Sequence, residues 1–261
     1  GDILISIDGN EIRDVLDYRF YLAERRIELL LSRDGKEYSV TIKKGEYDDI
    51  GLDFETPLMD EKHSCKNGCI FCFIDQLPEG MRKTMYFKDD DARLSFLLGN
   101  YVTLTNFSPR EVQRIMDLRI SPINVSVHAT DPDLREKLLG TPRARRLMDQ
   151  LKKLSDGGIE FHCQAVLCPG LNDGEALNKT ISELIALPGA LSLALVPVGL
   201  TNHREGLAEL RKYNADEAKA VIALADDVDA LSFPALVPTL EAVQASTSGC
   251  TIFILPLNAV G

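Results

Sequence analysis

The chain has 261 residues, of which 45% are hydrophobic and 26% are charged, and this balance excludes a disordered, collagen-like or coiled-coil protein. At roughly 150 residues per domain, this length predicts one or two domains. No apolar run approaches the roughly 20 residues that cross a bilayer, so we expect no membrane partner. The net charge of −11 repels phosphate backbones and argues against nucleic-acid partners.

The N-terminus and the cysteines predict the cellular compartment. The sequence starts at Gly1 without an initiator Met, a basic region or an apolar segment, which predicts a fragment without an export signal. Six cysteines are too few for a disulfide scaffold in a chain of this length, and three of them lie within eight positions. Metal binding or catalysis in a reducing compartment explains this spacing, so we expect a cytoplasmic protein.

Residues 1–48 are predicted to form a small β-rich domain. Apolar side chains alternate over residues 3–7 and end at Gly9-Asn10, and a second hairpin turns at Asp34-Gly35. Residues 14–24, between the hairpins, are a short helix candidate.

From residue 49 to about residue 220, short apolar runs alternate with helical patterns, which predicts β-α units and a parallel sheet. The clearest helix is Pro109–Leu118, because Ser108 and Glu111 form a capping-box pattern at its start. Other helices are predicted over residues 133–139, 143–155 and 174–187. Strands are predicted over residues 50–54, 84–87, 101–106, 123–129, 159–167 and 191–198.

Two of these strands place polar side chains on one face. Successive side chains of a strand point to opposite faces, so Ser126 and His128 share a face, and Gln164 lies on the polar face of the next strand. In a β/α barrel the apolar face meets the helices, and the polar face lines a lumen that binds ligands at the C-terminal ends of the strands. The alternative is an irregular sheet whose polar residues bind water.

Cys65, Cys69 and Cys72 form a C-x3-C-x2-C loop, the strongest signal in the sequence. Phe71 precedes the last cysteine, and Gly68 is expected to let the backbone curl so that the sulfurs converge. Three soft thiolates indicate a metal centre, and they leave one iron of a [4Fe–4S] cluster open to an external ligand. The spacing matches the loop with which radical S-adenosylmethionine (SAM) enzymes hold their cluster.

A zinc site is the alternative, in which His63, Asp75 or a remote residue completes the coordination. Cys163 and Cys168 lie an odd number of positions apart, so on one strand they face opposite sides and are predicted to be packing residues. Cys250 is isolated in the sequence and predicts nothing.

Longer motifs extend the match beyond the cysteines, and they cover residues 65–78, 86–91, 99–106, 121–128 and 162–173. With the first ten residues, they resemble a bacterial family that joins a PDZ domain to a radical SAM domain, domain of unknown function 512. The resemblance covers nearly all of residues 1–215. It implies an α/β fold in which a truncated PDZ-like domain, residues 1–48, precedes a partial (β/α)6 TIM-like barrel of the radical SAM type, residues 49–220.

The resemblance implies that Cys65, Cys69 and Cys72 ligate a [4Fe–4S] cluster and that SAM chelates the open iron. Reductive cleavage of SAM would give methionine and a 5′-deoxyadenosyl radical, with an electron donor such as flavodoxin or ferredoxin as a partner. Phe71 would lie beside the adenine, and Ser126 matches a serine that contacts SAM in related members. The substrate is unknown.

The Gly-Gly-Glu motif that usually binds the SAM ammonium is absent. Asp89, Asp90 and Asp91 stand in its place and are candidates for that role, with a solvated acidic turn as the alternative. Thr105 and Asn106 end the third predicted strand and are expected to face the same SAM-binding cavity. The alternative is that these two residues only cap the end of the strand. The residues expected to line this cavity are Thr103, Thr105, Asn106, Ser126, His128 and Gln164.

Both ends of the chain differ from the family. The start resembles the later part of a PDZ domain and lacks the carboxylate-binding loop and the first strand of the peptide groove. A peptide or protein tail is therefore expected to bind only to a full-length parent protein that contains these parts. Residues 221–261 are rich in Ala, Leu and Ser and are predicted to be a tail of atypical structure.

Three functions fit this sequence. The first is a radical SAM enzyme, and the second is a non-catalytic scaffold with a zinc or iron–sulfur centre and a PDZ-type docking domain. The third is an inactive, truncated remnant of such an enzyme. Polar inward faces on several strands favour the enzyme, because a scaffold needs no polar pocket.

Overall fold

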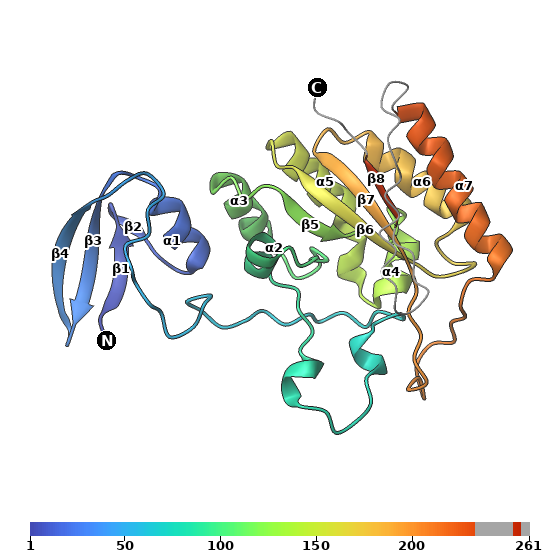
Figure 1. Cartoon of the computed structure of the whole chain (residues 1–261), viewed down its shortest axis with the longest axis horizontal. Helices are drawn as coiled ribbons and strands as arrows, with labels where there is room; N and C mark the ends of the chain where they lie inside the picture. The colour runs from blue at the N-terminus through green and yellow to red at the C-terminus, as the bar shows by residue number, and fades with distance from the viewer. Residues whose placement is uncertain (233–252, 257–261) are drawn as a thin grey trace. The chain divides into compact units, whose positions relative to one another are not determined.

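The computed structural model describes residues 1–232 and 253–256, and the chain divides into two compact units at residues 63 and 64 (Figure 1). Cys250 and most of the predicted tail lie outside the described residues. The predicted boundary at residue 220 falls inside the described helix α7, Ala215–Ser232. None of the described helices is both long enough and apolar enough to cross a bilayer.

The first unit is a four-stranded antiparallel sheet, in the order β2-β1-β3-β4, with one helix. Both predicted hairpins and the predicted helix form. Asp14 caps the helix by accepting hydrogen bonds from the backbone of Leu16 and Asp17. The elements are β1 (Ile3–Ile7), β2 (Asn10–Glu11), α1 (Val15–Tyr21), β3 (Arg26–Arg33) and β4 (Lys36–Lys43).

This unit extends beyond the predicted boundary at residue 48. The segment 50–54 forms no strand, so that prediction is wrong. Its apolar side chains, with Met59, pack against the core that Ile27 and Leu29 help to form. The ring of Phe54 makes an edge contact with Tyr18, with centroids 5.0 Å apart. The alternating apolar pattern therefore reflects packing on the first unit rather than pairing in a parallel sheet.

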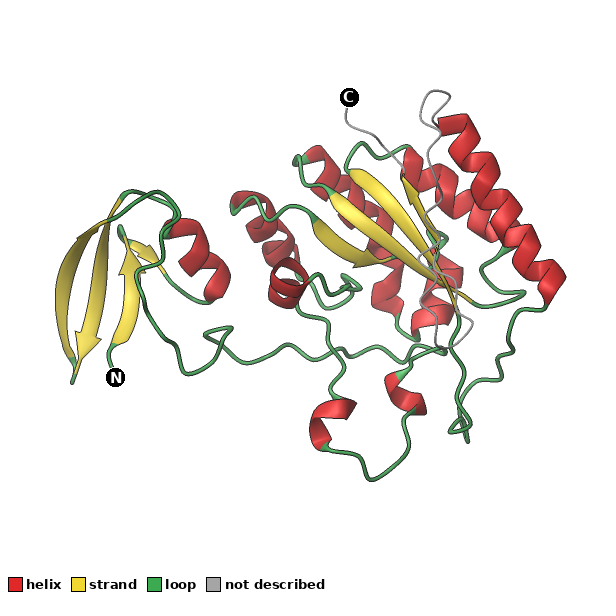
Figure 2. Ribbon diagram, viewed as in Figure 1, coloured by secondary structure: helices red, strands yellow, loops and turns green. Residues whose placement is uncertain are grey.

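The second unit is a mixed α/β structure around a sheet in the order β5-β6-β7-β8 (Figure 2). β5, β6 and β7 are parallel, and β8 pairs with β7 in the antiparallel direction. The strands are β5 (Ile123–Ser126), β6 (Phe161–Leu167), β7 (Ala190–Pro197) and β8 (Phe253–Pro256). The helices are α2 (Ala92–Leu98), α3 (Pro109–Asp117), α4 (Pro132–Leu139), α5 (Leu147–Asp156), α6 (Gly174–Ile185) and α7, with 3-10 turns η1 (Ile74–Gln76), η2 (Lys83–Tyr86) and η3 (Pro142–Arg146).

The predicted barrel of six parallel strands is not formed by the described residues. Residues 84–87 overlap η2 instead of a strand, and residues 101–106 contribute one parallel bridge, from Val102 to Val125. Beyond this bridge the segment leaves the strand conformation, because Leu104 has a φ of 60°. The Arg135 guanidinium donates to the carbonyl oxygen of Ser126 at the same place. The broader prediction of an α/β unit with a parallel sheet is confirmed.

The pattern of burial along β6 follows the predicted alternation. Phe161, Cys163, Ala165 and Leu167 are buried, whereas the residues between them are half-buried. Cys168 is also fully buried, so the packing role predicted for both cysteines is confirmed. The capping box at the start of α3 forms as predicted, between Ser108 and Glu111.

Candidate functional site

The cysteine loop is fixed to the C-terminal end of α4. The backbone N–H groups of Gly68 and Ile70 donate to the carbonyls of Leu139 and Leu138, each at 3.0 Å. The last carbonyls of a helix lack partners within the helix, so the loop and the helix end satisfy each other. Gly140 ends α4 with a φ of 65°, and a Cβ there would lie 2.5 Å from the Gly68 carbonyl oxygen. Gly140, rather than Gly68, is therefore the glycine that this loop geometry requires.

A buried chain of hydrogen bonds holds the loop from the other side. Asn67 lies between the first two cysteines; its Oδ1 accepts from the Thr105 hydroxyl at 2.8 Å, and its Nδ2 donates to Thr103 Oγ1 at 3.0 Å. The Thr103 hydroxyl donates to Asp90 Oδ2 at 2.7 Å, and the Thr103 backbone N–H donates to Asp90 Oδ1 at 2.6 Å. The network connects the cysteine loop to a buried carboxylate.

Replacing Asn67 by Ala should destabilise the second unit by about 2 kcal/mol, because the buried Thr103 and Thr105 hydroxyls each lose a partner. The loop should also bind metal less well. Chemical denaturation measures the stability. Lys66→Ala changes the adjacent, exposed residue and should stay within about 0.5 kcal/mol of the wild type. Equal stability of the two variants would contradict the role of the network.

The three loop cysteines are half-buried. Burial raises the pKa of Cys69 to about 12, and the neighbouring Cys65 and Cys72 sulfurs add to this shift. Burial also raises the pKa of Cys65. Thiols bind metals as thiolates, so metal binding must displace these protons and is favoured at higher pH.

The three loop cysteines offer soft thiolate ligands, the kind that iron–sulfur clusters use. Among the described residues, no three His, Cys, Asp or Glu side chains are arranged to hold a single ion, so the zinc site with His63 or Asp75 is not formed. Each thiolate of a cluster binds a different iron, so its sulfurs stand further apart than those around one zinc ion. That the three sulfurs converge on one centre stays a prediction.

Ser126 and Gln164 lie side by side, because they are partners in the parallel register of β5 and β6. Neither side chain forms a hydrogen bond with the described residues. Val166, two positions after Gln164 on the same face, packs against the same apolar cluster as Cys69, and this cluster includes Phe71. That Ser126 and Gln164 line a SAM pocket stays a prediction.

His128 follows β5 and is buried, with a φ of 63° that a non-glycine residue rarely adopts. Its Nδ1 accepts a hydrogen bond from the backbone N–H of Val166 at 3.1 Å. Burial and the charge of Arg135 lower the pKa of His128 to about 3, so the ring is neutral and carries its proton on Nε2. The ring of Phe71 lies against it, with centroids 4.7 Å apart. That Phe71 contacts an adenine stays a prediction.

The three neighbouring carboxylates all have partners within the protein. Asp91 caps α2 and pairs with the buried Arg93 at 2.7 Å, and Asp89 accepts from Asn100 Nδ2 at 2.6 Å. Asp90 and Asp91 are each 1% exposed, so the solvated acidic turn is wrong for these two residues. Burial raises the pKa of Asp90, and its hydrogen bonds to Thr103 oppose this shift. Binding of a SAM ammonium by one of the three stays a prediction.

Thr105 and Asn106 hold the cysteine loop through their side chains. Thr105 donates to Asn67, as described above, and Asn106 Nδ2 donates to the carbonyl of Ser64, directly before Cys65, at 3.2 Å. The structure therefore uses these polar groups to position the loop. That they also line a SAM pocket is untested and stays a prediction.

Three buried polar residues of the site were not predicted from the sequence: Asn67, Arg135 and Asn172. Asn172 Oδ1 accepts from the backbone N–H of Cys168 at 2.7 Å, and its Nδ2 donates to the His128 carbonyl at 2.8 Å. A signal existed for Arg135, which lies three and four positions before two buried leucines and therefore on the apolar face of its helix.

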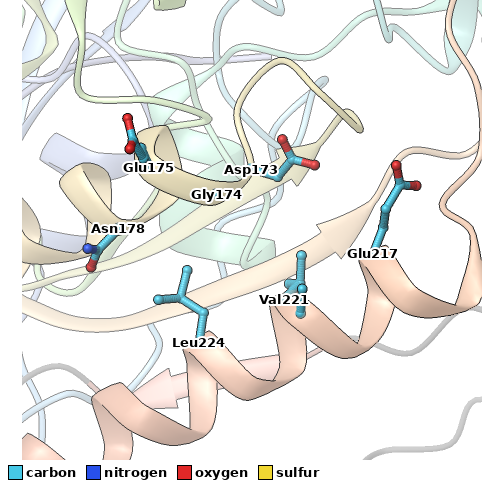
Figure 3. A pocket seen from close by; sticks show the side chains of 8 residues that line it. Asp173, Gly174, Glu175, Asn178, Glu217, Val221 and Leu224 are labelled. Carbon is cyan, nitrogen blue, oxygen red and sulfur yellow. The ribbon is translucent and has the colours of Figure 1, made fainter.

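A separate cavity of about 440 Å³ lies between α6 and α7 (Figure 3). Its lining includes Asp173, Glu175, Glu217, Val221 and Leu224, none of which is a predicted site residue.

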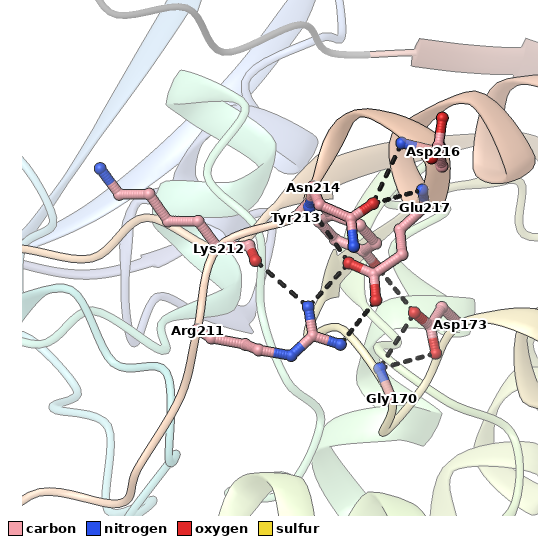
Figure 4. Close-up of polar contacts among 8 residues, drawn as sticks. All are labelled: Gly170, Asp173, Arg211, Lys212, Tyr213, Asn214, Asp216 and Glu217. Atoms are coloured by element: carbon pink, nitrogen blue, oxygen red, sulfur yellow. Dashed lines mark hydrogen bonds and ion pairs between the residues drawn. The ribbon is translucent and has the colours of Figure 1, made fainter.

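Beside this cavity, an ion pair and a hydroxyl contact fasten the chain that enters α7 (Figure 4). The Arg211 guanidinium binds the Glu217 carboxylate through two hydrogen bonds, at 2.6 and 2.7 Å. The Tyr213 hydroxyl lies 3.3 Å from Asp173 Oδ2, and Asp173 accepts from the backbone N–H of Gly170. These carboxylates therefore fix the local backbone.

Residues 44–193, more than half of the chain, match the model of the family described as radical SAM-like domain. Among curated proteins, a probable GTP 3′,8-cyclase from Pyrobaculum aerophilum is 32% identical over 108 residues, which cover 39% of this chain and 35% of that protein. The chain thus matches about a third of the length of this relative.

Two solved structures share parts of the fold. SuiB from Streptococcus suis, bound to S-adenosylmethionine, aligns with a TM-score of 0.39 and 15% identity over 64% of this chain and 46% of that chain. A radical SAM methyltransferase from Sphaerobacter thermophilus aligns with a TM-score of 0.36 and 16% identity over 85% of this chain and 73% of that chain. Both scores are low, so the family assignment rests on the sequence match.

Proposed function

The chain belongs to the family of radical SAM-like domains, and on this premise we propose that it is a radical SAM enzyme that holds a [4Fe–4S] cluster through Cys65, Cys69 and Cys72. When bound, the cluster supplies an electron that splits SAM into methionine and a 5′-deoxyadenosyl radical, which abstracts a hydrogen atom from a substrate. The observation that supports this most is the loop itself, in which three half-buried thiols are held rigidly by α4 and by Asn67.

The chain's own residues then bind and orient SAM. The Ser126 hydroxyl and the Gln164 amide offer hydrogen bonds from paired positions of β5 and β6, and the neutral His128 offers an Nε2–H donor. Phe71 offers an apolar surface that excludes water beside them.

We propose Asp90, within the run Asp89 to Asp91, as the acceptor for the SAM ammonium. Its carboxylate acts on the ionisation of Cys65, which places it near the loop, and an ionised carboxylate is a strong acceptor for an ammonium. Asp90→Asn should weaken SAM binding in a titration of the cluster-loaded protein. Asp89→Asn is the matched control, and an unchanged affinity in Asp90→Asn would shift the role to other residues.

Two partners belong to this proposal. A flavodoxin or a ferredoxin supplies the electron, as the resemblance to radical SAM enzymes implies. The first unit, a sheet with one helix, docks a peptide or protein tail in a longer parent, as its PDZ-like sequence implies.

The cluster assignment is tested by replacing each loop cysteine by Ala. The protein is loaded anaerobically with iron and sulfide, and its iron content, its sulfide content and its electron paramagnetic resonance (EPR) spectrum are measured. Each variant should lose most of the bound iron, because one of three protein ligands is gone. Cys163→Ala removes a fully buried cysteine of the sheet and should load like the wild type. If all three loop variants bound as much iron and sulfide as the wild type, the cluster assignment would be wrong.

A further inference from the structure

Arg135, on α4, is a buried cation close to the cysteine loop. It is 1% exposed, and its guanidinium forms no ion pair with the described residues. It donates instead to four backbone carbonyls at 2.6 to 2.9 Å, those of Thr103, Ser126, Val127 and Ala144.

A buried charge without an ion-pair partner costs free energy, and carbonyl dipoles offset that cost without cancelling the charge. The buried Asp90 carboxylate, which binds the same residue, Thr103, is an acidic group whose charge acts on Arg135. The same helix binds the cysteine loop through the carbonyls of Leu138 and Leu139. From the other side, the Arg135 guanidinium donates to the carbonyl of Thr103, whose hydroxyl oxygen accepts a hydrogen bond from Asn67 of the loop. The fold therefore directs a fixed positive charge at a loop that becomes negative when it binds metal.

Lys88 is a second cation beside the loop. Its carbonyl accepts from the backbone N–H of Cys65 at 2.8 Å, which fixes its position next to the first cysteine. Its Nζ pairs with the Asp75 carboxylate at 2.6 Å, and its side chain is 26% exposed. Its charge is thus partly offset by Asp75 and partly screened by water.

From this arrangement, and resting on the proposed function, we propose that Arg135 and Lys88 raise the reduction potential of the cluster, and that Arg135 has the larger effect. Reduction transfers one electron from an external low-potential donor, such as dithionite, to the cluster and adds one negative charge beside these cations. A nearby positive charge stabilises the reduced state, and more strongly where water does not screen it. Both are positioning residues, since neither is a ligand.

The test measures the midpoint potential of the cluster by EPR-monitored titration in anaerobically loaded variants. Arg135→Gln removes the buried charge and should shift the potential to a more negative value, whereas Arg135→Lys keeps the charge and should stay near the wild type. Lys88→Gln should shift it in the same direction by less. Asp75→Asn removes a negative charge next to Lys88 and should shift it to a more positive value.

The potential should shift in opposite directions in Lys88→Gln and Asp75→Asn, which distinguishes an effect of charge from an effect of structural damage. Lys88 and Asp75 are both near the surface, so these two variants test the inference even if Arg135→Gln does not fold. Unchanged potentials in the folded variants, or shifts of the same sign in Lys88→Gln and Asp75→Asn, would overturn the inference alone. A wild-type protein that takes up no cluster would overturn the proposed function and this inference with it.

Discussion

Gly140→Ala should destabilise the second unit by about 3 kcal/mol and reduce loading of the cysteine loop. The left-handed backbone at this position costs an L residue about 1 kcal/mol. A Cβ there would also lie 2.5 Å from the carbonyl oxygen of Gly68, so the loop must move away from the end of α4. Chemical denaturation and iron content after anaerobic loading measure the two effects.

Gly170→Ala is the matched control. Gly170 has a φ of 76°, but a Cβ there would meet no atom within 4 Å. This variant should therefore lose about 1 kcal/mol from backbone strain and load normally. If Gly140→Ala loses no more stability or iron than Gly170→Ala, the contact between α4 and the loop does not position the cysteines.

The stability of the second unit should fall as the pH falls below about 6.5, because of His128. Its pKa is lowered to about 3 in the folded protein, below the ordinary histidine value of 6.5, so the unfolded chain binds the proton first. The stabilisation is complete above pH 6.5 and is lost as the pH falls towards 3. The slope should reach about 1.4 kcal/mol per pH unit for this single proton.

Urea denaturation between pH 4 and pH 7 measures this slope. His128→Gln removes the titrating group, so its stability should change less with pH in that window, even though its absolute stability is lower. His203→Gln, at an exposed histidine, is the control. A slope in His128→Gln equal to that of the wild type would contradict the burial of a neutral His128.

Local sequence signals predicted the parts of the fold that depend on neighbouring residues. The capping box at Ser108 and Glu111 forms because both partners lie within one helical turn. The strands that became β5, β6 and β7 were predicted within a few residues, because each has a buried apolar face and a clear turn at its end. The same alternation placed Ser126 and Gln164 on one face.

Contacts between distant segments could not be predicted from the sequence. Residues 50–54 alternate like a strand, yet they pack on the first unit, since apolar alternation does not say which core it serves. The third predicted strand ends after Val102, where Leu104 has a φ of 60° and Arg135, some thirty positions later, donates to the carbonyls of Thr103 and Ser126. The role of Asn67 likewise depends on Thr103 and Thr105, which lie far along the chain.

The measurement that tests the radical SAM assignment most directly is the formation of 5′-deoxyadenosine. The wild-type protein and Cys69→Ala are loaded with iron and sulfide under anaerobic conditions, reduced with dithionite and incubated with SAM, and the product is quantified by liquid chromatography. We expect 5′-deoxyadenosine from the wild type, in proportion to its bound cluster, and none above background from Cys69→Ala. A fully loaded wild-type protein that forms no more 5′-deoxyadenosine than Cys69→Ala would contradict the proposed function.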